Sequence, residues 1–180
     1  MVPAQGYRRT FIALGSNLGD RIANCLQAVE LISHTDCTEV VRLSSPYVTE
    51  PVEMVSKNSF INAVVEIMTC LSPVTLLETL LDIEKKMGRD RSKGPDRTMD
   101  LDILCMEGVI MADEWRMSRL TLPHPAIRQR AFVLLPWAEI APDLLVAPWN
   151  KTVRQMLESL PSMYPVLKKT DWDTSKEARL

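Results

Sequence analysis

The sequence has few of the features that mark a chain for export, for a membrane or for general binding to nucleic acid. It has four cysteines and no CxxC pair, which excludes the usual zinc-ribbon and redox motifs. No apolar run is long enough to cross a bilayer, and residues 1–11 lack the apolar core of a signal peptide. The net charge is only -2, so a general attraction to nucleic acid or to an anionic membrane is not expected. We therefore expect a cytoplasmic protein whose thiols stay reduced.

Two further absences narrow the function classes. No GxxxxGK[ST] segment occurs, so the chain is not a P-loop enzyme, and the glycines of LGSNLG at 14–19 favour a tight turn at the end of a strand. Aromatic residues are scarce, with three Phe and three Tyr, whereas an RNA-binding module of the RRM type needs exposed aromatics on its central strands. Such a module is the main competing interpretation of the fold predicted below, and the composition disfavours it.

What is present is an ordinary globular composition. The 180 residues are 46% apolar and 24% charged, which suits one domain with a sizeable core. No internal repeat, low-complexity block or linker interrupts the chain. We expect a single domain over residues 1–180, with an ordered core at 8–165 and a polar, loosely held tail at 166–180. At this length we expect no fused second enzyme.

The expected elements follow the order β-α-β-β-α-β. Strands are predicted at 8–17, 38–51, 60–69 and 99–106, and helices at 18–34 and 72–88. Asp20 and Ser72 are suitable N-caps for these helices. Because the loop between the second and third strands is too short for a crossover helix, the order favours an α+β fold, a ferredoxin-like βαββαβ sandwich, over an open parallel sheet. A short strand and helical segments within 120–144 and 150–160 form a C-terminal helical extension.

Two aspartates in the fourth predicted strand carry the strongest chemical signal. Asp100 and Asp102 share one face of the strand, about 6.6 Å apart along the backbone, while Leu101 and Ile103 face the core. Such neighbours raise each other's pKa unless a cation lies between them. Mg²⁺ takes oxygen ligands and keeps positions open for phosphate oxygens. The pair therefore predicts a metal site for phosphoryl-type transfer, and the alternative is a solvated strand face paired with arginines.

A basic loop precedes the aspartates and strengthens this hypothesis. It contains Arg89, Arg91, Lys93 and Arg97. Arginine binds phosphate oxygens in a bidentate manner, and a loop hinged at Gly88 and Gly94 could close over a polyphosphate. A solvent-exposed charged loop is the alternative.

His124 lies between two prolines, which constrain its backbone. It could donate a hydrogen bond to a phosphate oxygen, and the alternative is an ordinary turn histidine. Arg128 and Arg130 follow at the expected start of a helix, where anions are favoured.

Several segments together resemble the 6-hydroxymethyl-7,8-dihydropterin pyrophosphokinases, enzymes of folate biosynthesis. They occur in the family's order between residues 10 and 145 and read ALGSNLGDR, FINAVVEI, IEKKMGRDR, GPDRTMDLDIL and LTLPHPAIRQRAFVLLPWAEIAPDL. The resemblance implies transfer of the terminal pyrophosphate of ATP to the pterin hydroxymethyl group, with release of AMP. It also implies small-molecule substrates only, no nucleic acid or membrane partner, and a monomer.

The resemblance further implies a role for each matching residue. Two Mg²⁺ ions would be held by Asp100 and Asp102, and Arg89 and Arg97 would stabilise charge on the transferring group. The implied contacts of ATP are Glu84, Arg91, the backbone of Ile103, Arg119, Thr121, His124 and Arg130. The implied contacts of the pterin are Thr49, Pro51, Val52, Phe60, Asn62 and Phe132.

The residues themselves are compatible with these implied roles. Phe60 and Asn62 share one face of the third predicted strand, and an aromatic beside an amide suits a flat heterocycle with donors and acceptors on its rim. The alternative is a core aromatic and a turn-capping asparagine. The matched metal and phosphate positions all hold suitable residues, which argues against a regulatory domain that has lost its chemistry.

Four positions depart from the family pattern. Lys93 stands where some members carry an aromatic residue, and Glu50 replaces a frequent proline on the pterin side. Pro125 follows the histidine where some members have tyrosine. Asp96 is inserted between Pro95 and the loop arginine, which puts the role of Arg97 in question.

Overall fold

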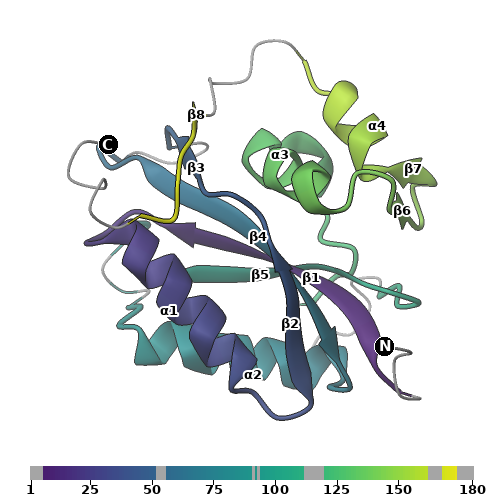
Figure 1. Ribbon diagram of the computed structural model, residues 1–180, viewed down its shortest axis with the longest axis horizontal. Helices are drawn as coiled ribbons and strands as arrows, with labels where there is room; N and C mark the ends of the chain where they lie inside the picture. Colours follow the sequence, from purple (N-terminus) through teal and green to yellow (C-terminus); the bar gives the residue numbers. More distant parts are fainter. Residues whose placement is uncertain are drawn as a thin grey trace.

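The computed structural model describes residues 6–51, 56–90, 92, 94–111, 120–161 and 168–173. These residues form a mixed α/β structure in which an antiparallel sheet is covered by helices on both faces. Figure 1 shows α1 and α2 against one face, and α3 and α4 beyond the other. The helices are α1 (Arg21–Ser33), α2 (Pro73–Lys86), α3 (Ala131–Ile140) and α4 (Val153–Glu158).

The sheet is built around three long strands. Its order is β5-β1-β4-β3-β8, and β2 pairs with β4 beside β3. The strands are β1 (Arg8–Ser16), β2 (Thr38–Leu43), β3 (Tyr47–Thr49), β4 (Phe60–Thr69), β5 (Asp100–Met106) and β8 (Lys168–Lys169). Because β1 lies between β4 and β5, the end of β1 meets the residues of both neighbours.

The central strand β4 confirms the predicted division into two faces. Ile61, Ala63, Val65 and Ile67 pack in the core below α1 and α2. Val64 packs on the opposite side, in the core below α3. Helices cover both faces, so almost every residue of this strand is buried.

The two helices on the first face begin where their capping residues predict. The Asp20 carboxylate accepts the backbone N–H of Ala23 at 2.9 Å, and the Ser72 hydroxyl accepts that of Thr75 at 3.1 Å. Their buried side chains recur at helical spacing and comprise Ile22, Cys25, Ala28, Ile32, Leu76, Leu80 and Ile83. Burying one large aliphatic side chain of this kind contributes about 1.5–3 kcal/mol.

The single strand predicted over 38–51 is divided into β2 and β3 in the structure. Pro46 has no N–H to donate to a ladder. Just before it, the Ser44 N–H donates to the carbonyl of Val64 at 2.9 Å, and the Ser44 hydroxyl accepts the Val64 N–H at 3.0 Å. The serine therefore replaces a regular ladder pair with a side-chain bond, and the strand breaks there.

The C-terminal extension covers the second face of the sheet. It comprises α3, α4 and the hairpin β6 (Leu145–Val146) with β7 (Lys151–Thr152) (Figure 1). Trp137 of α3 is fully buried, and its ring centroid lies 5.4 Å from that of Phe11 on β1. This contact ties α3 to the middle of the sheet.

Part of the segment expected to be a loose tail is attached to the sheet. Lys168 and Lys169 form β8, which pairs with Val48 and Tyr47 of β3. The Trp172 indole donates to the carbonyl of Ser44 at 3.0 Å. Polar composition alone does not predict this attachment, because it depends on the unpaired edge that β3 presents.

Candidate active site

A cavity of about 290 Å³ opens between the ends of β1, β4 and β5 and the start of α3. It is lined by Ala13, Leu14, Gly15, Asn62, Arg97, Asp100, Asp102, His124, Arg130, Phe132 and Val133. The structure therefore brings together acidic, basic, amide and aromatic residues that lie far apart in the sequence. Most of them are residues that the sequence singles out.

The floor of this cavity is made by two small residues of β1. Gly15 is paired with Asn62 on one side and with Asp100 on the other, and Ala13 lies opposite Asp102. A side chain larger than methyl at either position would fill the space between these polar groups. Sequence reasoning missed both residues, although small residues at alternating positions near the end of a strand were a usable signal.

Asp100 forms ion pairs with the guanidinium groups of two arginines. Its Oδ1 lies 2.6 Å from Arg89 Nη1, and its Oδ2 lies 2.8 Å from Arg97 Nη2. Arg89 also donates to the carbonyl of Met99 at 3.1 Å, and its Nε lies 3.5 Å from the Glu84 carboxylate. Both oxygens of Asp100 are thus neutralised from the basic loop, in charge-assisted contacts stronger than neutral hydrogen bonds.

Asp102 is the more open carboxylate, with 43% of its side chain exposed. Burial of its carboxyl by the surrounding cavity wall raises its pKa, and the nearby charge of Asp100 raises it further. His124, Arg130 and Arg97 act in the opposite direction. Its closest ion pair is with Arg130, at 4.0 Å. A cation that binds in the cavity would therefore stabilise the ionised form of Asp102.

His124 enters the cavity in its neutral form. Burial lowers its pKa, and so does the charge of Arg130, while the nearby Asp102 raises it. Its Nδ1 accepts the backbone N–H of Ala126 at 3.2 Å, so the proton of the neutral ring lies on Nε2. The backbone N–H of His124 donates to the Leu104 carbonyl at 2.8 Å. The ring is thus fixed as a donor.

Asn62 and Phe132 line the cavity, and the Phe60 ring lies beside it without lining it. The Asn62 carboxamide is buried and donates through Nδ2 to the Thr49 hydroxyl at 2.8 Å. The Phe60 ring lies beneath the Arg97 guanidinium, 5.0 Å from its Cζ to the ring centroid. Phe132, on the cavity wall, has the Arg130 Cζ 5.8 Å from its ring centroid. Each aromatic ring is therefore associated with one cation.

Comparison with known proteins decides the family. The model of the 7,8-dihydro-6-hydroxymethylpterin-pyrophosphokinase (HPPK) family matches residues 11–142. The chain belongs to the HPPK family. A 2-amino-4-hydroxy-6-hydroxymethyldihydropteridine pyrophosphokinase of Methylorubrum extorquens is 45% identical over 154 residues, which cover 84% of this chain and 93% of the relative. A Bacillus subtilis protein of the same name is 44% identical over 132 residues, covering 72% and 76%.

Solved structures support the fold of this HPPK chain. The crystal structure of wild-type Plasmodium falciparum HPPK-DHPS with pteroate matches with a TM-score of 0.65 at 13% identity. The match covers 88% of this chain and 43% of that one, so the chain spans less than half of the solved protein. At this identity the likeness concerns the fold alone.

The remaining residues predicted for the site lie behind or beside the cavity. Glu84, Thr49 and Ile103 are buried, and Glu84 accepts the Leu101 N–H at 2.8 Å. Pro51 and Thr121 are half-buried and do not line the cavity. The predictions for Val52, Arg91 and Arg119 fall outside the described residues. The described part of the chain holds no cluster of three or more His, Cys, Asp or Glu side chains placed to hold a metal ion.

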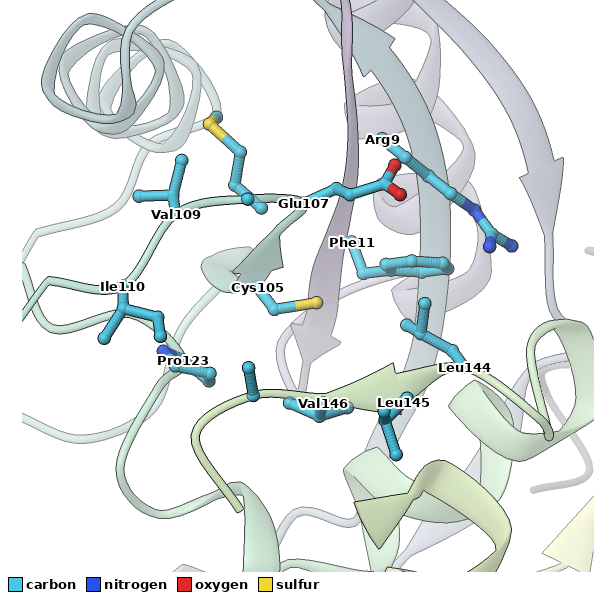
Figure 2. Close-up of a pocket in the computed structure, with 13 residues that line it drawn as sticks. Arg9, Phe11, Cys105, Glu107, Val109, Ile110, Pro123, Leu144, Leu145 and Val146 are labelled. Atoms are coloured by element: carbon cyan, nitrogen blue, oxygen red, sulfur yellow. The ribbon is translucent and has the colours of Figure 1, made fainter. Parts of the chain in front are cut away.

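A second cavity of about 230 Å³ lies at the far end of β5 and is mainly apolar. Figure 2 shows Phe11 and Cys105 on its sheet side, with Leu144 and Val146 opposite them. Burial raises the pKa of the Cys105 thiol to about 12, so it stays protonated. The charged residues that line this cavity are Arg9 and Glu107, and it lacks the aspartate pair of the first cavity, which is therefore the better candidate for phosphoryl chemistry. No helix among the described residues combines the length and the apolar composition needed to cross a bilayer.

Proposed function

We propose that this chain transfers the terminal pyrophosphate of ATP to the hydroxymethyl group of 6-hydroxymethyl-7,8-dihydropterin in folate biosynthesis. The hydroxyl oxygen bonds to the β-phosphorus of ATP, the bond from that phosphorus to the α-phosphate oxygen breaks, and the hydroxyl proton is lost. The products are the pterin diphosphate and AMP. The observation that carries the proposal is the family match over residues 11–142, a span that includes every residue lining the first cavity.

Asp100 and Asp102 are the residues that would hold Mg²⁺, with two ions expected. Their chemistry fits a hard cation, because both residues line the cavity with carboxylate oxygens and the charge of Asp100 helps to raise the pKa of Asp102. When bound, Mg²⁺ supplies neutralisation of the phosphate charge and a template for its oxygens. Asp102 keeps 43% of its side chain exposed for this purpose.

Arg89 and Arg97 would bind the transferring phosphate groups. Both neutralise Asp100, at 2.6 and 2.8 Å. A polyphosphate offers the same guanidinium groups more oxygens than one carboxylate does. Arg97 is the more exposed of the two, at 24% against 14% of the side chain. We therefore infer that Arg97 is the arginine that reaches the transferring group and that Arg89, supported by Glu84, holds Asp100.

The two substrates would occupy opposite sides of the aspartate pair. His124 and Arg130 flank Asp102, and a fixed Nε2 donor beside a guanidinium suits the phosphate groups of ATP. Thr121, Arg119, Arg91, Glu84 and the backbone of Ile103 are also proposed for the ATP side. Asn62 and Phe60 lie toward Thr49 and suit the pterin, whose ring would stack against Phe60 and Phe132. Pro51 and Val52 complete that proposed side.

The arrangement of the fold, the number of domains and the assembly state belong to the same proposal. The strand order β5-β1-β4-β2, read without β3 and β8, supports a ferredoxin-like sandwich. We propose that the chain acts as one monomeric domain in the cytoplasm, with ATP and the pterin as its only partners.

Product analysis tests the function. The purified chain is incubated with ATP, Mg²⁺ and 6-hydroxymethyl-7,8-dihydropterin, and the nucleotide products are separated. The expected result is AMP and pterin diphosphate in equal amounts, dependent on both Mg²⁺ and the pterin. Asp102→Asn serves as the inactive variant. Asp143→Asn is the matched control, because it makes the same change at an aspartate whose side chain is 82% exposed. Release of ADP would mean transfer of a single phosphoryl group, and nucleotide binding without turnover would mean a domain that lost its chemistry. Either result overturns the proposal.

A further inference from the structure

Asp96, the inserted residue that precedes Arg97, joins three segments through its carboxylate. Its Oδ1 accepts from the Asn17 side chain at 2.7 Å, and its Oδ2 accepts from the Asn58 side chain at 3.3 Å. Hydrogen bonds from Ser56, Asn17 and Asn58 lower the pKa of Asp96 against the opposing effect of burial. The carboxylate thus links the turn after β1, the segment before β4 and the loop before β5.

Asn17 completes the connection to the backbone of Arg97. Its side-chain oxygen accepts the Arg97 N–H at 2.7 Å, and its own backbone N–H donates to the Arg97 carbonyl at 3.1 Å. Asn17 is only 3% exposed. Because its Nδ2 is directed to Asp96, its Oδ1 must face the Arg97 N–H. The carboxylate of Asp96 therefore sets the orientation of the amide that holds Arg97.

The side chain of Arg97 continues from this fixed backbone into the cavity. Its Nη2 reaches Asp100 at 2.8 Å, and its Nη1 donates to the Pro95 carbonyl at 2.9 Å. Its guanidinium also covers the Phe60 ring at 5.0 Å. One side chain thus contacts both the aspartate proposed for the metal and the ring proposed for the pterin.

We propose that Asp96 and Asn17 form a positioning pair that presents Arg97 to the transferring group. Neither residue lines the cavity, so they act through Arg97 rather than on the substrates. This inference rests on the proposed function, since it takes Arg97 to act during transfer.

Substitution of the carboxylate provides a graded test. Asp96→Ala removes both acceptors, and we expect kcat for AMP release to fall about tenfold while both KM values change by less than about twofold. Asp96→Asn keeps an oxygen for Asn17 but places an amide against the Asn58 donor, so a smaller loss is expected. The matched control, Asp143→Asn, should leave kcat unchanged. Equal kcat in wild type and Asp96→Ala would overturn the proposal.

A double-mutant cycle separates positioning from a general effect on stability. If Asp96 acts through Arg97, the variant carrying both Asp96→Ala and Arg97→Ala should be no slower than Arg97→Ala alone. If the two losses multiply, Asp96 acts independently of Arg97, and the positioning role is excluded.

A measurement without turnover distinguishes this inference from the proposed function. Nitrogen-15 relaxation of the Arg97 Nε–Hε group reports how restricted the side chain is. It should be rigid in the wild type and mobile in Asp96→Ala, with the wild-type signal retained in Asp143→Asn. Unchanged rigidity in Asp96→Ala would overturn the inference, whatever products the wild-type chain forms. Absence of AMP with the expected relaxation change would instead remove the proposed function and leave the pair in place.

Discussion

Gly15→Ala should weaken the site although it adds only one methyl group. A Cβ at Gly15 would lie 3.2 Å from Asn62 Oδ1 and 3.9 Å from Asp100 Cβ. The contact with the Asn62 oxygen is tighter than ordinary van der Waals contact, so one group must shift by a few tenths of an ångström. Asn62 is buried and its Nδ2 is bonded to Thr49 at 2.8 Å. The shift therefore either stretches that bond or turns the amide away from the cavity.

The expected magnitude follows from the hydrogen bond at stake. A bond of this kind is worth about 1–1.5 kcal/mol, which corresponds to about a fivefold to tenfold loss in kcat/KM for the pterin. Alanine in place of glycine in a strand stabilises the fold by about 0.5–1 kcal/mol through the unfolded state. This gain in stability offsets the destabilisation caused by the close contact of the added methyl group, so Tm should change by less than about 4 °C.

Steady-state kinetics with the pterin varied at saturating ATP measure the effect, and thermal unfolding measures stability. Thr49→Val removes the acceptor that holds Asn62. The loss in kcat/KM for the pterin caused by Gly15→Ala should therefore be smaller in a Thr49→Val background than in the wild type. Pterin kinetics of Gly15→Ala equal to those of wild type would refute the reasoning. So would an undiminished effect in the Thr49→Val background.

Three other perturbations test the remaining assignments. Asp102→Asn should abolish AMP release while leaving Tm equal or higher, because it relieves repulsion from Asp100; a large fall in Tm would contradict the assignment. Arg97→Ala should lower kcat by at least about 100-fold with little change in the Kd of ATP, and equal losses in both would indicate ground-state binding. Glu139→Gln tests the pH dependence of stability. Bonds to Ser45, Tyr47 and Lys169 outweigh burial and lower the Glu139 pKa. This stabilisation is present above the ordinary value of 4.5 and is lost as pH falls through the folded pKa. The difference in Tm between Glu139→Gln and the wild type should therefore shrink in acid. A difference that stays constant with pH would contradict a stabilising role of the Glu139 carboxylate.

Local patterns were sufficient to predict much of the fold. The caps Asp20 and Ser72 act within three residues of themselves, and the alternation along β4 is a property of one strand. The division of strand 38–51 was not predicted, since it depends on the bonds of Ser44 to Val64, which lies twenty residues away in the chain. The attachment of Trp172 to the Ser44 carbonyl spans an even longer separation.

In the candidate site, too, some residues can be recognised within one segment of the sequence and others depend on distant segments. Asp100, Asp102, Arg97 and His124 stand out in the sequence because charged pairs, basic loops and proline-flanked residues are visible one segment at a time. Gly15 was expected in a tight turn, but it lies within β1, and its place in the site depends on the two strands on either side of it.

The sequence alone indicates the family, because its motifs recur in a fixed order over residues 11–142. It also indicates the strand faces and the residue types available for phosphoryl transfer, because these are visible within single segments. Tertiary structure alone decided which of those residues meet around one cavity. It also decided that Asp100 is neutralised by two arginines while Asp102 stays open. Asp96 illustrates the reason: its carboxylate accepts a hydrogen bond from Asn17, which is far away in the sequence and comes into contact with it only in the folded chain.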